Sequence, residues 1–143
     1  MPLLVILYTG QLDAEADMST LCHQLADAML TVKDEAGKQV FPTGGVRVLA
    51  YPAPHYAVAD SGAAGRAAGG TGNYAFVYLN LRMGRGRSEA TQQRAGQTLL
   101  EVAKAFFAPV MAQRHIGITL QIDVGPEVFD AKHSNLHPLF NKA

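Results

Sequence analysis

The chain has 143 residues, a length that suits a single domain with its own hydrophobic core. Its 12 basic and 12 acidic side chains balance, so nothing in the charge points to nucleic acid or an anionic membrane surface. Cys22 is the single cysteine, which excludes an intrachain disulfide and means that a metal site would need other ligands. The first apolar segment is too short to span a membrane and follows no basic leader, so we expect a cytoplasmic protein.

Residues 2–8 are almost wholly apolar, which predicts a central strand buried on both faces. Pro2 stands at its start, a place where strands tolerate proline. Removal of Met1 would turn the Pro2 nitrogen into a free amine with a reference pKa of roughly 7.7–8.0. Burial or nearby cations would lower that pKa further, toward the value that suits proton transfer. Many chains begin Met-Pro without any catalytic role, so a site also requires partners elsewhere in the chain.

A helix is expected after a turn at residues 9–12, with Asp13 as its N-cap and residues 34–38 turning the chain at its end. It is predicted from apolar residues at helical spacing: Met18, Leu21, Cys22, Leu25 and Met29. Cys22 lies on this apolar side, which favours a small buried side chain over a nucleophile. Residues 46–51 then read as a second strand, completing a β-α-β unit with two parallel strands.

Residues 61–72 are nearly all glycine and alanine, with Arg66 in the middle. Such a segment buries little apolar surface, so a mobile loop is expected, either a disordered insertion or a lid over a site.

The second half repeats the pattern, with a strand at residues 74–83, a helix capped by Ser88, and a strand at residues 116–122. The buried stripe of the helix is predicted to be Ala95, Leu99, Val102 and Phe106. Pro109 is expected to kink the helix or to end it near Ala108.

These elements predict an α+β fold: one domain over residues 1–143, built from two β-α-β halves at about 1–60 and 73–143. Four strands would form a mixed sheet with two helices on one face. The other face, carrying Phe76 and Tyr78 or their apolar alternates, would need a partner chain to cover it.

Two arginines are candidates for binding a carboxylate. Arg47 lies in an apolar strand, where a paired or functional role is favoured. Arg87 lies at a helix N-terminus flanked by glycines, which suits an anion, although a solvated surface arginine is an equal alternative. His133 and His137 have a spacing that could hold a metal on a helix, but no third ligand accompanies them, so a polar C-terminal turn is favoured.

Taken together, these features make the sequence resemble the 5-carboxymethyl-2-hydroxymuconate isomerases of the tautomerase superfamily. The resemblance rests on these segments: Pro2 after Met1, Phe41-Pro42 leading to Gly45-Val46-Arg47, Tyr74-Ala75-Phe76-Val77, Gly84-Arg85-Gly86-Arg87-Ser88, Gln92-Gln93-Arg94-Ala95-Gly96 and the final run from His133 to Phe140. It covers nearly the whole chain except the Gly/Ala-rich loop.

The resemblance implies a homotrimer of two β-α-β units per chain that needs no metal or organic cofactor. It implies that Pro2 is the base that moves a proton on a dienol substrate, in bacterial breakdown of homoprotocatechuate. Arg47 and Arg87 would hold the carboxylates of this small-molecule substrate or polarise its carbonyl. Leu3 and Leu7 replace a histidine and an acidic residue of the family pattern, so a more apolar site is expected.

Two alternatives stay open. The chain could be a tautomerase acting on a smaller 2-hydroxydienoate, using the same proline. It could also be a non-catalytic trimeric binding protein, if Met1 is retained and the Pro2 nitrogen is an amide without basicity.

Overall fold

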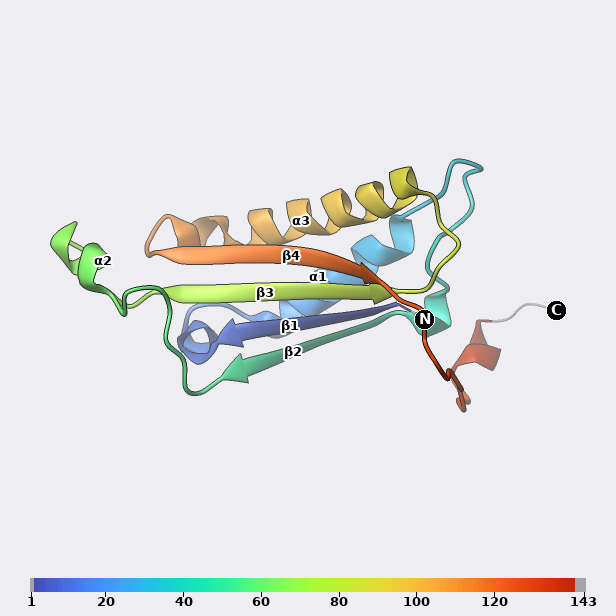
Figure 1. Cartoon of the computed structure of the whole chain (residues 1–143), viewed down its shortest axis with the longest axis horizontal. Coiled ribbons are helices and arrows are strands. Elements are labelled where there is room, and N and C mark those ends of the chain that lie inside the picture. The colour runs from blue at the N-terminus through green and yellow to red at the C-terminus, as the bar shows by residue number, and fades with distance from the viewer. Residues whose placement is uncertain (1, 141–143) are drawn as a thin grey trace.

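The computed structural model describes residues 2–140. Its strands are β1 (Leu3–Thr9), β2 (Arg47–Ala53), β3 (Ala75–Met83) and β4 (Ile116–Val124). Its α-helices are α1 (Met18–Thr31), α2 (Ala63–Ala67) and α3 (Glu89–Met111), with short 3-10 helices η1 (Gly10–Ala14), η2 (Thr43–Gly45) and η3 (His137–Leu139). Helices α1 and α3 lie side by side on one face of the sheet (Figure 1). No helix in this part of the chain is both long and apolar enough to cross a membrane.

The four strands form one mixed sheet in the order β2-β1-β3-β4. Strands β1 and β2 are parallel, β3 and β4 are parallel, and β1 and β3 are antiparallel. This is the arrangement of two β-α-β units joined edge to edge, so the predicted fold class and the central position of the first strand are confirmed.

The core lies between the sheet and the two long helices. Alternate residues of β1 and β3 face the helices, as the period of two in a strand requires. The fully buried side chains include Leu4, Ile6, Leu21, Leu25, Leu79, Leu81, Leu99 and Phe107. The expectation that the first strand is buried on both faces is wrong for a single chain, because Leu7 on the opposite face is 47% exposed.

The face of the sheet opposite the helices is uncovered and partly apolar. Leu49 and Tyr51 of β2 are 42% and 52% exposed, next to Leu7 of β1. Phe76 and Tyr78 lie on this face, as predicted, and the Tyr78 hydroxyl donates to Gln121 Oε1 at 2.8 Å. We call this surface the open face.

Helix α1 begins later than the sequence indicated. Asp17, and not Asp13, is the N-cap, and its carboxylate accepts a hydrogen bond from the Thr20 backbone N–H at 3.2 Å. The prediction for Asp13 is wrong because residues 10–14 form the 3-10 helix η1, where the Asp13 carboxylate accepts a bond from the Tyr8 hydroxyl. The helix ends at Thr31, ahead of the predicted turn, and Cys22 is only partly buried.

Helix α3 begins at the predicted cap, where Ser88 Oγ accepts from the Thr91 N–H at 3.1 Å. Two expectations about its second half are wrong. The buried stripe passes through Ala103 and Phe107, while Val102 and Phe106 lie only partly buried beside it. Pro109 does not end the helix near Ala108, because the helix continues to Met111, and a proline in the last turn removes only one backbone hydrogen bond.

The Gly/Ala-rich segment contains structure that composition did not predict. The Asp60 carboxylate accepts bonds from the backbone N–H groups of Gly62 and Ala64 at 2.9 and 2.8 Å. The Tyr74 hydroxyl accepts another from the N–H of Gly65 at 2.8 Å. These acceptors satisfy the free amides of the first helical turn, and the five-residue helix α2 forms where a loop without regular structure was expected.

Candidate active site

The three candidate residues lie at one end of the sheet. Pro2, which is buried, directly precedes β1, and Arg47 is the first residue of β2. Because β1 and β2 are parallel, both strands start at the same end. Strand β3 runs the other way, so its last residues and the following loop with Arg87 return to that end. Figure 1 shows the beginnings of β1 and β2 beside the arrowhead of β3.

Arg47 is half-buried and anchored to the loop before its strand. Its Nη1 donates to the carbonyl of Gly44 at 2.7 Å and to that of Val46 at 3.0 Å. These bonds orient the guanidinium group and use one of its nitrogens, and no bond from its other nitrogens is found within residues 2–140. Arg47 lines a recess of about 570 Å³ together with His133, Ser134, Asn135 and Leu136.

Arg87 connects two loops. Its Nη2 donates to the Val40 carbonyl at 2.9 Å and its Nη1 donates to the Gly84 carbonyl at 3.3 Å. The guanidinium carbon lies 5.8 Å from the centre of the Phe41 ring, a cation–π distance. Arg87 therefore supports the loops at this end of the sheet.

The anion site expected at the start of α3 is used by the protein itself. The Glu35 carboxylate accepts hydrogen bonds from the hydroxyls of Ser88 and Thr91, the latter at 2.9 Å. The bond from Ser88 is the main reason that the pKa of Glu35 lies below its usual range. Nothing local in the sequence predicts this contact, because Glu35 and Ser88 are 53 residues apart.

A third arginine at this end was missed. Arg82 and Arg47 both lie opposite Leu3, one on each neighbouring strand, so the three side chains form a row across the open face. Arg82 is exposed and lies close to Gly125, where an added Cβ atom would come within 2.5 Å of its Nη2. The alternation of residues 74–83 placed Arg82 on the same face as Phe76, but only the strand register shows that it neighbours Arg47.

His137 belongs to a C-terminal turn, as favoured, while His133 lies before it in a segment without regular structure. The N–H of Phe140 donates to the carbonyl of His137 at 3.0 Å, which closes the 3-10 helix η3. Over residues 2–140, no three His, Cys, Asp or Glu side chains cluster in a way that could hold a metal ion.

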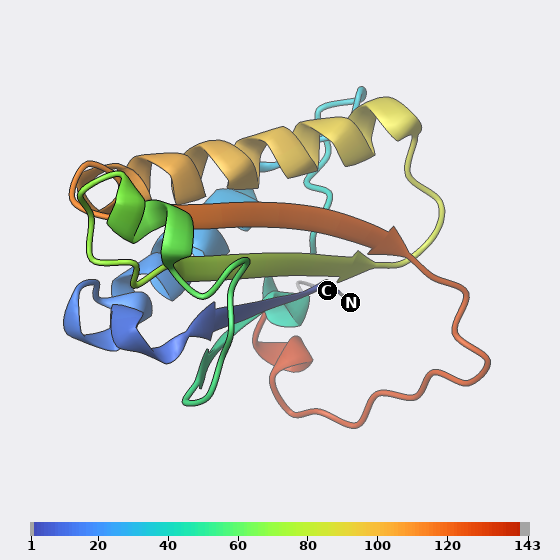
Figure 2. The same cartoon turned by 60° about the vertical axis from the view of Figure 1, so that its left-hand side comes forward.

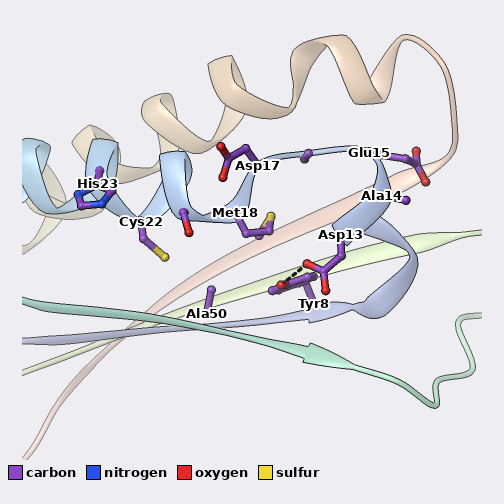
Figure 3. Close-up of a pocket in the computed structure, with 11 residues that line it drawn as sticks. Tyr8, Asp13, Ala14, Glu15, Asp17, Met18, Cys22, His23 and Ala50 are labelled. Carbon is purple, nitrogen blue, oxygen red and sulfur yellow. Dashed lines mark hydrogen bonds between the residues drawn. The ribbon is translucent and has the colours of Figure 1, made fainter.

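A cleft of about 740 Å³ lies at the other end of β1, between η1, α1 and β2. Figure 3 shows Asp13, Glu15 and Asp17 around it, with the Tyr8 hydroxyl donating to Asp13 Oδ1 at 2.6 Å. Burial, followed by that bond, raises the pKa of Tyr8, so its phenol stays protonated. Three carboxylates repel an anionic ligand, so this cleft does not suit a carboxylate substrate, whereas the end with Arg47, Arg82 and Arg87 does.

Comparisons with known proteins identify the family to which the chain belongs. A model of the family described as 5-carboxymethyl-2-hydroxymuconate isomerase matches residues 2–140. The 5-carboxymethyl-2-hydroxymuconate Delta-isomerase of Escherichia coli is 27% identical over 140 residues, which are 98% of this chain and 99% of that protein.

Two crystal structures extend the similarity to the fold. One, of a 5-carboxymethyl-2-hydroxymuconate delta-isomerase, is 66% identical with a TM-score of 0.97, over 100% of this chain and 95% of that one. The other, of a 5-carboxymethyl-2-hydroxymuconate isomerase from Deinococcus radiodurans R1, is 33% identical with a TM-score of 0.81, over 99% and 95% of the two chains. The chain therefore belongs to the 5-carboxymethyl-2-hydroxymuconate isomerase family.

Proposed function

We propose that the protein is an isomerase that ketonises 5-carboxymethyl-2-hydroxymuconate or a close dienol polycarboxylate, with the Pro2 amine as base. The observation that carries this proposal is the convergence of Pro2, Arg47 and Arg87 at one end of the sheet. Membership of the family and the activity named for its Escherichia coli relative support the choice of substrate.

Ketonisation of the dienol requires that one proton be removed from the enol oxygen and that one be delivered to a carbon atom. A single amine can do both by carrying the proton between the two positions. Negative charge grows on the oxygen next to the substrate carboxylate as the transition state forms. Arg47 and Arg87 would stabilise that charge, and their positive field would lower the pKa of the Pro2 amine.

The open face supports a proposed homotrimer. Leu7, Leu49 and Tyr51 expose apolar surface on the β1 and β2 side of this face, and their burial against other copies would remove it from water.

The experiment is a comparison of wild type with Pro2→Ala after the intact mass has shown that Met1 is absent from both. The amine of an N-terminal alanine is primary and no longer part of a ring on β1, so we expect turnover of the dienol to fall by a factor of about 100 or more. An unchanged rate would overturn the role of Pro2. A chain that retains Met1 in its native host, and is inactive there, would instead support the non-catalytic binding protein.

A further inference from the structure

The last part of the chain, residues 125–140, forms an arm that returns to the proposed active-site end. It leaves β4 beyond Val124 and runs without regular structure until η3, beneath the start of β1 and β2 (Figure 2). Most of its side chains are exposed, including Val128 and Phe129. The end of the arm is nevertheless held in place, because η3 contacts η2.

The contact between η3 and η2 leaves little room for a side chain at Gly44. A Cβ atom on Gly44 would lie 3.0 Å from Phe140 Cδ2 and 3.1 Å from His137 Nδ1. The carbonyl of the same Gly44 accepts the hydrogen bond from Arg47 Nη1. Gly44 therefore connects the arm to the candidate arginine, and the recess between them has a defined shape.

Polar groups of the arm face Arg47 across this recess. The lining consists of Arg47, His133, Ser134, Asn135 and Leu136. Ser134 Oγ accepts a bond from the backbone N–H of Leu136 at 2.9 Å, which fixes a local turn around Asn135. An Asn amide has two donors, a Ser hydroxyl keeps its own donor, and a guanidinium group offers charge and several donors.

The recess itself carries no charge that opposes an anion. Asp130 of the arm is paired with Lys132 at 2.7 Å, and no carboxylate among residues 2–140 lines the recess. Its volume is within the usual range for a small-molecule pocket.

We propose that the arm side of this recess, formed by His133, Ser134 and Asn135 opposite Arg47, binds the substrate carboxylate that lies farthest from the enol, and that Asn135 and His133 decide whether a substrate with that carboxylate is preferred. The inference rests on the proposed function for the identity of the substrate. It assigns to the arm a binding role that the proton transfer itself does not require.

The kinetic test compares two dienols, one with the distal carboxylate and one without it, as substrates of wild type, Asn135→Ala and Asn135→Asp. Removing a hydrogen bond to a charged group should lower kcat/KM for the carboxylate-bearing dienol about 10-fold relative to the other. Asn135→Asp should lower that ratio further, because it places like charges together. Val128→Ala, on the same arm but outside the recess, is the matched control and should leave the ratio unchanged.

A binding test separates this inference from the proposed function. The probe is adipate, a saturated dicarboxylate that cannot react, with hexanoate as the monocarboxylate control, and the signal is the NMR shift of the His133 ring protons. In wild type and in Val128→Ala, adipate should shift the His133 ring protons more than hexanoate does. In Asn135→Asp, the two compounds should give the same shift.

The outcomes are distinct. Adipate binding that needs Asn135, in a protein that turns over no dienol, would support the subsite and overturn the proposed reaction. Equal losses of kcat/KM for both dienols, or equal effects of adipate and hexanoate, would overturn the subsite and leave the arm with only a structural role.

Discussion

Leu3 lies directly opposite Arg47 in the parallel pair of β1 and β2. This register places the guanidinium group beside the residue that follows Pro2, so the proposed base and the proposed carboxylate ligand are held by the same pair of strands. A register shift of one residue would move Arg47 to the helix side of the sheet.

Arg47→Ala should reduce kcat/KM for the dienol about 100-fold, because a preorganised charge near the developing negative oxygen is lost. The structural loss should be small, since its bonds to the Gly44 and Val46 carbonyls are each worth about 1 kcal/mol. Kinetics and urea unfolding of the same preparation measure both effects. Arg66→Ala, on exposed α2, is the control. A variant that loses folding in proportion to activity would contradict a role in binding.

Arg87→Ala should lose stability as well as activity. The change removes donors from the Val40 and Gly84 carbonyls and the cation–π contact with Phe41. We expect the free energy of unfolding to fall by about 1–3 kcal/mol, more than for Arg47→Ala. Urea unfolding curves of the two variants, measured side by side, test this ranking. Equal stability of the two would show that the loops do not depend on Arg87.

Glu35→Gln should make the protein less stable at neutral pH, and the difference from wild type should disappear in acid. The folded-state pKa of Glu35 is lowered, chiefly by the bond from Ser88, so its carboxylate contributes stability above the unfolded pKa of about 4.3. That contribution is lost as the pH falls through the lower folded-state pKa. The measurement is Tm of both proteins from pH 7 to pH 3.

The control for this pH series is Glu127→Gln, which removes a carboxylate from the exposed arm. A difference in Tm between wild type and Glu35→Gln that stays constant from pH 7 to pH 3 would contradict the assigned role of the Ser88 and Thr91 hydroxyls.

Gly44→Ala should destabilise the protein by about 1–3 kcal/mol, because the new methyl group overpacks against Phe140 and His137. The arm should also become more sensitive to limited proteolysis. Gly117→Ala is a suitable control, since its Cβ atom would lie 3.6 Å from Phe76 Cδ1, an ordinary contact. Equal stability of the two variants would mean that η3 does not pack on η2 in solution.

Leu49→Glu should weaken the proposed trimer, because it places a charge on the apolar part of the open face. Sedimentation velocity should show a lower mass than for wild type at the same concentration. Met111→Glu introduces the same charge at another exposed apolar position, at the end of α3, and should leave the mass unchanged. A wild type that sediments as a monomer would remove the need for a partner on this face.

The strands and their pairing into two β-α-β units could be predicted because each signal is local. Residues 74–83 alternate so regularly that burial of every second side chain identifies the inner face. The cap at Ser88 is equally local, since its partner N–H belongs to Thr91.

The buried side chains of α3 could not all be predicted from the sequence, because Phe106 and Phe107 are adjacent and both apolar. Their order of burial depends on how the helix is rotated against the sheet, and packing chooses Phe107. The end of α3 was equally hard to predict. The helix continues past Pro109, and Val110 in its last turn is buried in the core.

The sequence by itself determined the α+β class, the order of strands and helices and the candidates Pro2, Arg47 and Arg87, since these depend on period, residue type and family motifs. Only the tertiary structure decided that the three share one end of the sheet, that Glu35 occupies the start of α3, and that the arm faces Arg47. Such contacts join residues far apart in the chain, so their geometry is set by strand register and packing, for which no short segment carries a signal.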